Sequence, residues 1–383
     1  MADIKALAHE VFPYVVEMRR DFHRNPEPSF EEFRTTDRIA EELDKMGIPY
    51  RRFEPSGLVG DIVGGKPGKC IFLRADIDAL SVKEESGVEF ASEREGFMHA
   101  CGHDTHAAML LGAAKVLNSI RDELCGSVKV LFQPAEELAM GAKHIIAQGA
   151  IEGADAGFGM HIFAQMPVGQ LGITSGVIHP AADYYKLDVH GVTSHGALPD
   201  EGVDATVAAA AIVMNLQTIS SREFSPLEPV VVTVGTLHSG QRFNVISNHA
   251  ELEGTVRLFN EELHQKIPGM MARIAENTAA AFRCTAELDY QFKSDMLVND
   301  EAMTELARGA ALKVAGEEHI APIRRSMGGE DFSAYTHIVP CAFVALGGGG
   351  EAPQHSEKFC IDESAFETGV AMYAQVAVDF LNG

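Results

Sequence analysis

The sequence is poor in basic residues: its 383 residues include 31 Lys and Arg against 55 Asp and Glu, giving a formal net charge of −24. No run of Lys or Arg exceeds two residues, whereas proteins that bind nucleic acids attract phosphates with clustered basic side chains. We therefore expect no nucleic-acid partner. Hydrophobic residues make up 46% and charged residues 22%, as in ordinary globular proteins, so the acidity indicates a solvated surface rather than disorder.

Long apolar runs and paired cysteines are also absent from the sequence. The most apolar tract, residues 205–213, is nine residues long, whereas a helix needs about 20 to cross a bilayer. The start, MADIK, lacks the basic and apolar segments of a signal peptide. The six cysteines, at positions 70, 101, 125, 284, 341 and 360, contain no CxxC pair, as expected of thiols in a reducing compartment. We expect a cytoplasmic protein with no membrane partner.

Strands and helices alternate at both ends of the chain. Ser29 and Glu32 have the spacing of a capping box before a helix, and Gly47 predicts the end of that helix. The other expected elements are strands over residues 70–73, 128–132 and 341–346 and helices over residues 107–117 and 363–381. This alternation predicts an α/β fold with a mostly parallel sheet.

The pattern changes in the middle of the chain. Strands are expected over 184–190, 230–237, 250–258 and 285–292, and helices over 203–219 and 261–282. Their order is β-α-β-β-α-β, which is typical of a ferredoxin-like α+β module. The sequence therefore predicts one α/β domain, formed by residues 1–182 and 293–383, that is interrupted by an inserted module at residues 183–292.

Two polar clusters carry residues suited to chemistry. Residues 98–106, MHACGHDTH, place three histidines, a thiol and a carboxylate before a helix, and Cys and His are the usual ligands of zinc-like ions. The alternative is a polar loop with a helix cap at Asp104. Glu136 and Glu137 follow a predicted strand, where one could bind metal while the other accepts a proton. The alternative for this pair is a favourable contact with a helix dipole.

Further residues able to bind metals lie at the ends of predicted strands or in a Gly-rich loop. They are Asp76 in RADID, His161 in GMH and His355 in QHS. In open α/β sheets, sites gather at the carboxyl ends of the strands. Each histidine alone could be structural, but together these segments favour a metal site.

The motifs resemble those of the M20 metallopeptidase and amidohydrolase family. They are RADIDAL (74–80), MHACGHDTH (98–106), FQPAEE (132–137), GMH (159–161), SHGALPDEGVDA (194–205), FNVISNHAELEGTVR (243–257) and HSEKF (355–359). The most similar branch contains hippurate hydrolases, N-acyl-amino-acid amidohydrolases, auxin-conjugate hydrolases and aminobenzoyl-glutamate hydrolase. The resemblance extends over nearly the whole chain.

The resemblance implies a dinuclear site for divalent ions. Zn²⁺ or Mn²⁺ are expected, with Co²⁺ or Ni²⁺ as alternatives, and a thiolate ligand favours zinc over magnesium or calcium. The implied ligands are Cys101 as the bridging residue together with His103, Glu137, His161 and His355. Glu136 would be the general base and acid, and Asp76 would orient a ligand histidine or tune the electrostatics of the site.

The resemblance also assigns a role to the inserted module as a lid and dimerisation domain, so we expect a homodimer. His195 would reach the partner subunit's active site and stabilise the oxyanion, and Asn244 would contact substrate. The alternative for His195 is a turn histidine beside Gly196. Residues 327–332, MGGEDF, match a family loop that lines the site, but we assign them no catalytic role.

The expected reaction is hydrolysis of an N-acyl amino acid or a related conjugate. A dipeptidase or an aminobenzoyl-glutamate-type hydrolase is the second candidate, and a metal-binding regulatory protein without activity is the third. Three departures from the family pattern weaken any transfer of substrate identity: Asp200, Ser247 and residues 163–165. None of them is an expected metal ligand.

Overall fold

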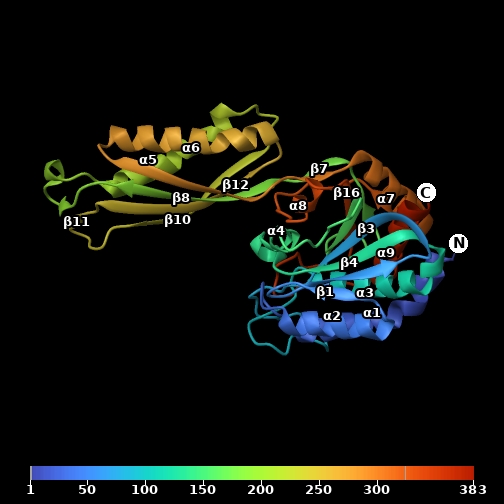
Figure 1. Cartoon of the computed structure of the whole chain (residues 1–383). Coiled ribbons are helices and arrows are strands. Elements are labelled where there is room, and N and C mark those ends of the chain that lie inside the picture. Colours follow the sequence, from blue (N-terminus) through green and yellow to red (C-terminus); the bar gives the residue numbers. More distant parts are fainter. Residues whose placement is uncertain (1, 324) are drawn as a thin grey trace. The chain divides into compact units, whose positions relative to one another are not determined.

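The computed structural model describes residues 2–323 and 325–383, and the chain divides into two compact units (Figure 1). The larger unit comprises the chain up to Ile178 together with Val298–Arg325 and Glu330–Gly383. The inserted unit comprises His179–Leu297 and Ser326–Gly329. Among the described residues, no helix combines the length and the apolar character needed to cross a bilayer.

An eight-stranded sheet forms the centre of the larger unit, in the order β1-β2-β4-β3-β5-β16-β6-β15. The strands are β1 (Tyr50–Arg52), β2 (Leu58–Val63), β3 (Lys66–Asp76), β4 (Cys125–Gln133), β5 (Ala156–Phe163), β6 (Leu171–Gly172), β15 (Ile320–Ala321) and β16 (Cys341–Gly347). The four central strands, from β4 to β16, are parallel, whereas β1 and β2 add to the sheet in antiparallel fashion. The predicted α/β fold with a mostly parallel sheet is confirmed.

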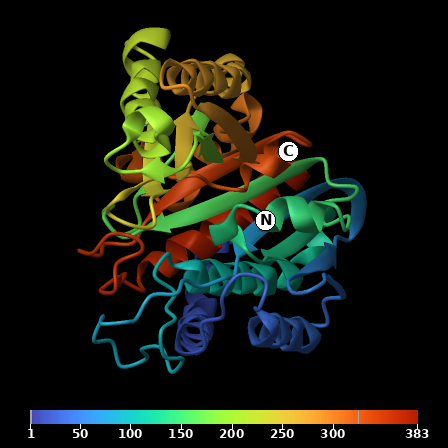
Figure 2. The same cartoon turned by 90° about the vertical axis from the view of Figure 1, so that its left-hand side faces the viewer.

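Both faces of this sheet are apolar, because successive side chains of a strand point to opposite faces. On β3, Ile71 and Leu73 belong to the main core, whereas Phe72 contacts Phe332 and Tyr335 on the other side. The helices of the unit are α1 (Ile4–Arg24), α2 (Phe33–Met46), α3 (His103–Ser119), α4 (Gly141–Ile146), α7 (Glu301–Val314), α8 (Ser333–Thr336) and α9 (Ala365–Asn382). Helices α1, α3 and α9 pack against one another, and both α3 and α9 contact β3. The two blue N-terminal helices, α1 and α2, lie on the same side of the sheet (Figure 2).

The start of α2 differs from the prediction, although its end does not. Gly47 ends the helix in a left-handed conformation, with φ of 69°, as expected. The capping box is wrong, because Ser29 donates to the carboxylate of Asp78 and Glu32 points into the core. Instead, the Glu27 carboxylate accepts from the main-chain N–H groups of residues 34 and 35. Tertiary contacts thus replace the local capping pattern.

The inserted unit has the predicted element order β-α-β-β-α-β. Its elements are β8 (Ala181–His190), α5 (Ala205–Leu216), β10 (Val230–Ser239), β12 (His249–Leu258), α6 (Glu261–Ala281) and β13 (Thr285–Ser294). The strands form an antiparallel sheet in the order β10-β12-β8-β13, and α5 and α6 cover one of its faces (Figure 1). Strand β8 begins before residue 183 and β13 continues beyond residue 292, so the predicted range 183–292 is slightly too short for this sheet.

Two small ladders complete the topology. Strands β9 (Ser194–His195) and β11 (Val245–Ile246) pair in antiparallel fashion within the inserted unit. Strands β7 (Gly176–His179) and β14 (Leu297–Asn299) form a separate two-stranded sheet where the chain passes between the units.

Candidate metal centre

The five candidate ligands come from four segments of the larger unit. Cys101 lies in the loop before α3 and His103 is the first residue of that helix. Glu137 belongs to a short 3-10 turn, Glu136–Leu138, that follows β4. His355 lies in the loop after β16. His161 lies within β5 rather than beyond its end as expected, because this strand continues through Phe163.

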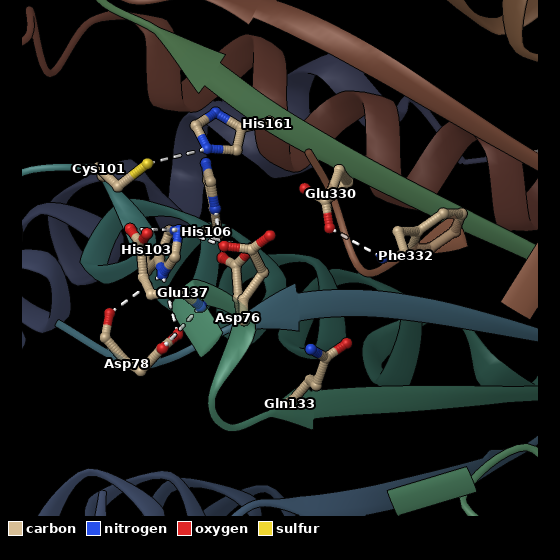
Figure 3. A network of polar contacts seen from close by, with 12 residues as sticks. Asp76, Asp78, Cys101, His103, His106, Gln133, Glu137, His161, Glu330 and Phe332 are labelled. Atoms are coloured by element: carbon tan, nitrogen blue, oxygen red, sulfur yellow. Dashed lines mark hydrogen bonds and ion pairs between the residues drawn. The ribbon is translucent and has the colours of Figure 1, made fainter. Parts of the chain in front are cut away.

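Cys101 is shared by two groups of potential ligand atoms. In the first group Cys101, His103 and His161 have such atoms within 4.8 Å of one another, and in the second Cys101, Glu137 and His355 do so. The Cys101 sulfur lies 3.3 Å from His161 Nε2 (Figure 3), and His355 Nε2 lies 3.5 Å from Glu137 Oε1. Apart from Cys101 and His103, these residues are far apart in the sequence, and the fold brings them together.

The two buried histidines present Nε2 toward this cluster. His103 Nδ1 lies 3.0 Å from the carbonyl oxygen of Asp78 and 3.1 Å from its Oδ1, and His161 Nδ1 lies 2.7 Å from the carbonyl oxygen of Ile162. Because these acceptors require a hydrogen on Nδ1, the Nε2 lone pairs are available. Among the described residues, His103 Nε2 and Glu137 Oε1 are buried without a hydrogen-bond partner. Unpaired nitrogen and oxygen atoms beside a thiol sulfur fit a transition-metal cation.

Asp76 lies beside His106 and Arg74. Its Oδ1 lies 2.5 Å from His106 Nδ1 and its Oδ2 accepts from Arg74 Nη1 at 2.6 Å, whereas His103 Nε2 is 3.8 Å away. His106 Nε2 in turn accepts from the main-chain N–H of Ile162. Both nitrogens of His106 are therefore engaged in hydrogen bonds. Asp76 orients His106, and the residue that orients His103 is Asp78.

Asp78 was missed as a functional residue at the level of sequence. Its position in RADID, two residues beyond Asp76 at the end of a buried strand, is the sequence feature that could have identified it. Figure 3 shows its carboxylate directed at His103. His99, the remaining histidine of MHACGHDTH, is buried and belongs to neither of the two ligand groups.

Glu136 lies in an acidic environment beside the ligand groups. Burial, followed by the charges of Glu330 and Asp331, holds the pKa of Glu136 well above its usual range. Arg74 partly offsets these acids, since its Nη2 donates to Glu330 at 3.0 Å and to Asp331 at 2.8 Å. Burial and the charge of nearby Glu137 likewise raise the pKa of the Cys101 thiol. A divalent cation would oppose both shifts, because positive charge favours the ionised forms.

His195 and Asn244 lie side by side in the inserted unit. His195 on β9 pairs with Val245 on β11, and the N–H of Gly196 donates to the carbonyl oxygen of Asn244 at 2.8 Å. His195 is exposed, and its Nδ1 accepts from the N–H of Ala197, which directs its hydrogen to Nε2. Asn244 Oδ1 has no hydrogen-bond partner in the described part of the chain. The imidazole of His195 is thus at the surface, whereas the unpaired Oδ1 of Asn244 is buried.

Comparison with known proteins identifies the family. The sequence model of the peptidase family M20/M25/M40 matches residues 72–379. The chain belongs to this family. N-acetylcysteine deacetylase of Bacillus subtilis strain 168 is 37% identical over 369 residues, which cover 95% of this chain and 96% of the relative. Thermostable carboxypeptidase 2 of Saccharolobus solfataricus is also 37% identical, over 97% of each chain.

A solved structure of this M20 family shares the fold over the whole chain. The YXEP protein of Bacillus subtilis, a dinuclear metal-binding peptidase, superposes with a TM-score of 0.88 and 34% identity and covers 98% of this chain and 99% of its own. The predicted family is confirmed. The chain described here is a metal-dependent hydrolase of amide C–N bonds.

Proposed function

We propose that this M20 enzyme hydrolyses N-acyl amino acids or related conjugates to a carboxylate and an amino acid, with Glu136 as the general base. The observation that carries the proposal is the position of Glu136, whose Oε2 lies 3.9 Å from the unpaired Nε2 of His103. The deacetylase relative acts on an N-acylated amino acid, as its name states. A carboxylate placed beside the site can take a proton from water and return it to the leaving amine.

We assign two divalent ions to the ligand groups, with Cys101 as the shared ligand. His103 and His161 would complete one site, and Glu137 and His355 the other. Zn²⁺ or Mn²⁺ are the proposed ions, with Co²⁺ or Ni²⁺ as alternatives, since a thiolate and imidazoles disfavour Mg²⁺ and Ca²⁺. When bound, such ions act as Lewis acids toward the amide carbonyl and make water a stronger acid. Asp78 would keep His103 Nε2 directed at its ion.

We further propose that the inserted unit, predicted at residues 183–292, is the lid and dimerisation domain between the two parts of the catalytic domain at 1–182 and 293–383. In a homodimer, His195 would donate from Nε2 to the oxyanion in the partner subunit's site, and Asn244 would contact the substrate. Phe243 and Val245, on either side of Asn244, are 98% and 38% exposed, and these neighbouring apolar side chains support a protein contact there. A cytoplasmic location agrees with six free thiols.

Peptides are the second candidate substrate class. The carboxypeptidase relative is as similar in sequence as the deacetylase, and the same residues could cleave either kind of amide. An activity screen separates the two classes: acetyl, benzoyl, aminobenzoyl and long-chain acyl amino acids are compared with dipeptides, each with Mn²⁺ or Zn²⁺. Faster release of amine from the acyl amino acids supports our proposal, and a preference for dipeptides supports the alternative.

The Glu136→Gln variant tests the mechanism. We expect kcat to fall by about 10²–10⁴-fold, which is the usual contribution of a general base, while elemental analysis finds the wild-type metal content. Glu123→Gln, at an exposed glutamate after α3, is the matched control and should leave kcat unchanged. Unaltered hydrolysis by Glu136→Gln would overturn the role of this residue.

A further inference from the structure

The segment that carries Glu136 and Glu137 has an unusual backbone. It joins β4 to α4, and two of its residues, Ala135 and Ala139, are left-handed, each with φ of 53°. This conformation is unfavourable for residues with a β-carbon. The two ends of the segment also touch, because a β-carbon on Gly141 would lie 1.7 Å from the carbonyl oxygen of Pro134. Such a backbone persists only where its surroundings hold it in place.

Three buried carboxylates hold the main chain of this segment. Glu32 Oε1 accepts from the N–H of Ala135 at 2.9 Å. Asp78 Oδ2 accepts from the N–H of Glu137 at 3.1 Å. Asp331 Oδ2 accepts from the N–H of Ala142 at 2.9 Å. The three acids come from separate parts of the sequence, so the segment is anchored to three different parts of the fold.

Asp331 holds both ends of the segment. Besides the N–H of Ala142, its carboxylate accepts from the Gln133 side chain at 2.8 and 2.9 Å and from Arg74 at 2.8 Å. Gln133 is the last residue of β4 and Ala142 lies in the first turn of α4. The main-chain N–H of Asp331 also lies 3.5 Å from Glu136 Oε1. This one residue therefore contacts the segment before, within and after the turn.

We infer that Glu32 and Asp331 are positioning residues for the hydrolytic reaction, which act by fixing the main chain that carries Glu136. The inference deepens the proposed function, since it depends on Glu136 as the base. It also gives a role to the MGGEDF segment. A general base must lie within hydrogen-bond reach of its proton, and a displacement of about 1 Å can cost about 100-fold in rate.

Conservative variants separate positioning from simple packing. In Asp331→Asn a single carbonyl oxygen replaces two oxygens that serve Gln133, Arg74 and Ala142, so one N–H loses its acceptor. We expect kcat to fall by about 10–100-fold with KM within about threefold of the wild-type value, because the substrate's own binding groups are untouched. Because the same segment carries the proposed ligand Glu137, kcat is compared at saturating metal, with the metal content checked by elemental analysis.

At Glu32, a conservative variant should restore the activity that an alanine variant loses. Its second oxygen accepts from the hydroxyl of Ser56 at 2.6 Å. In Glu32→Gln the amide oxygen can still accept from the N–H of Ala135 while the amide group donates to Ser56. We expect Glu32→Gln to keep most of the wild-type kcat and Glu32→Ala to lose it as Asp331→Asn does. The control is Asp300→Ala, which removes the N-cap of α7 and should lower stability but not kcat. Equal kcat in Glu32→Ala and wild type would overturn the inference.

A double variant shows whether Asp331 acts through Glu136. Non-additive effects identify residues that work as a unit, so Asp331→Asn should cost little further kcat in a Glu136→Gln background. A full additional loss overturns the inference and leaves the proposed function intact. Wild-type turnover by Glu136→Gln alone overturns the proposed function.

Amide hydrogen exchange provides a measurement that does not require turnover. In the full-length protein, peptides covering residues 133–142 should exchange about 10-fold faster in Asp331→Asn and Glu32→Ala, and at the wild-type rate in Glu32→Gln. The same peptides should be unaffected in Asp300→Ala. Wild-type exchange in Asp331→Asn would contradict the anchoring role.

Discussion

Asp78 contacts His103 through two of its oxygens: the main-chain carbonyl lies 3.0 Å from His103 Nδ1 and the carboxylate Oδ1 lies 3.1 Å from it. Partners of this kind keep a ligand histidine in one tautomer and orientation, and their loss usually costs about 10–100-fold in metal affinity. Asp78→Ala keeps the carbonyl but also removes the acceptor of the Glu137 N–H, so we expect a loss within this range.

A competition titration of the Asp78→Ala apoprotein with a chromophoric chelator measures this loss directly. The control is Asp61→Ala, since Asp61 lies on β2, is partly exposed and pairs with Lys129. Zinc affinity in Asp78→Ala equal to that of the control would show that the carbonyl alone is sufficient to orient His103.

His106 should not be a metal ligand, because Asp76 and the N–H of Ile162 occupy its two nitrogens. We expect His106→Ala to bind as many ions per chain as the wild-type protein. Its free energy of unfolding should fall by about 1–3 kcal/mol, since two buried polar groups lose their partner. His161→Ala should instead lose bound metal. Elemental analysis after dialysis, together with chemical denaturation, distinguishes the two variants, and the prediction fails if both lose metal equally.

The sequence was most informative where local rules decide the structure. The end of α2 at Gly47 and the strands within residues 70–73 and 128–132 follow from glycine geometry and apolar runs, and all three are present. The capping box failed because the partners of Ser29 and Glu32 are distant in the chain. No local sequence pattern shows that a buried carboxylate will form its hydrogen bond with a residue distant in the chain.

Two histidines of MHACGHDTH show that local patterns are equally insufficient at the site. His103 and His106 are alike in sequence and both are fully buried, and only their neighbours differ. The Nε2 of His103 is unpaired, whereas that of His106 accepts from a main-chain N–H on β5. That N–H is supplied 56 residues later in the chain, so spacing alone could not separate the two histidines.

Removal of bound metal should destabilise the larger unit. Glu136, Glu330 and Asp331 have carboxylate oxygens within 4.8 Å of one another, and a bound cation offsets such repulsion. A ligand that binds only the folded state adds about 2.7 kcal/mol at 100 times its Kd. We therefore expect chelation to lower Tm by several degrees.

Thermal scans of chelated protein test this effect, with Zn²⁺, Mn²⁺ or Mg²⁺ added back. Zn²⁺ or Mn²⁺ should restore Tm, whereas Mg²⁺ should not, because thiolate and imidazole ligands suit it poorly. A Cys101→Ala variant, which lacks the shared ligand, should show a smaller response to Zn²⁺. Restoration of Tm by Mg²⁺ alone would contradict the proposed ligand set.

The inserted unit contains a buried histidine–aspartate pair remote in sequence from the ligand segments. His264 Nε2 on α6 lies 2.6 Å from Asp183 Oδ2 on β8, and the hydroxyl of Tyr290 on β13 donates to the same oxygen at 2.7 Å. Burial lowers the pKa of His264, but the hydrogen bond and charge of Asp183 outweigh it, helped by Glu261 and Asp295, so that the pKa is raised above 6.5. Arg257 on β12, whose guanidinium donates weakly to the carbonyl oxygen of Asp183, is the nearby opposing charge.

This pair should make the inserted unit less stable as the pH rises. A group whose pKa is higher in the folded state contributes its full stabilisation below its unfolded value of 6.5 and loses it as pH passes through the folded value. We therefore expect exchange in peptides of α6 and β8, corrected for the intrinsic pH dependence, to indicate lower protection at pH 9 than at pH 6. His264→Gln should be less stable than wild type at pH 6 and should lose most of this difference between the two pH values. If the variant keeps the wild-type pH dependence, another group in the inserted unit is responsible for it.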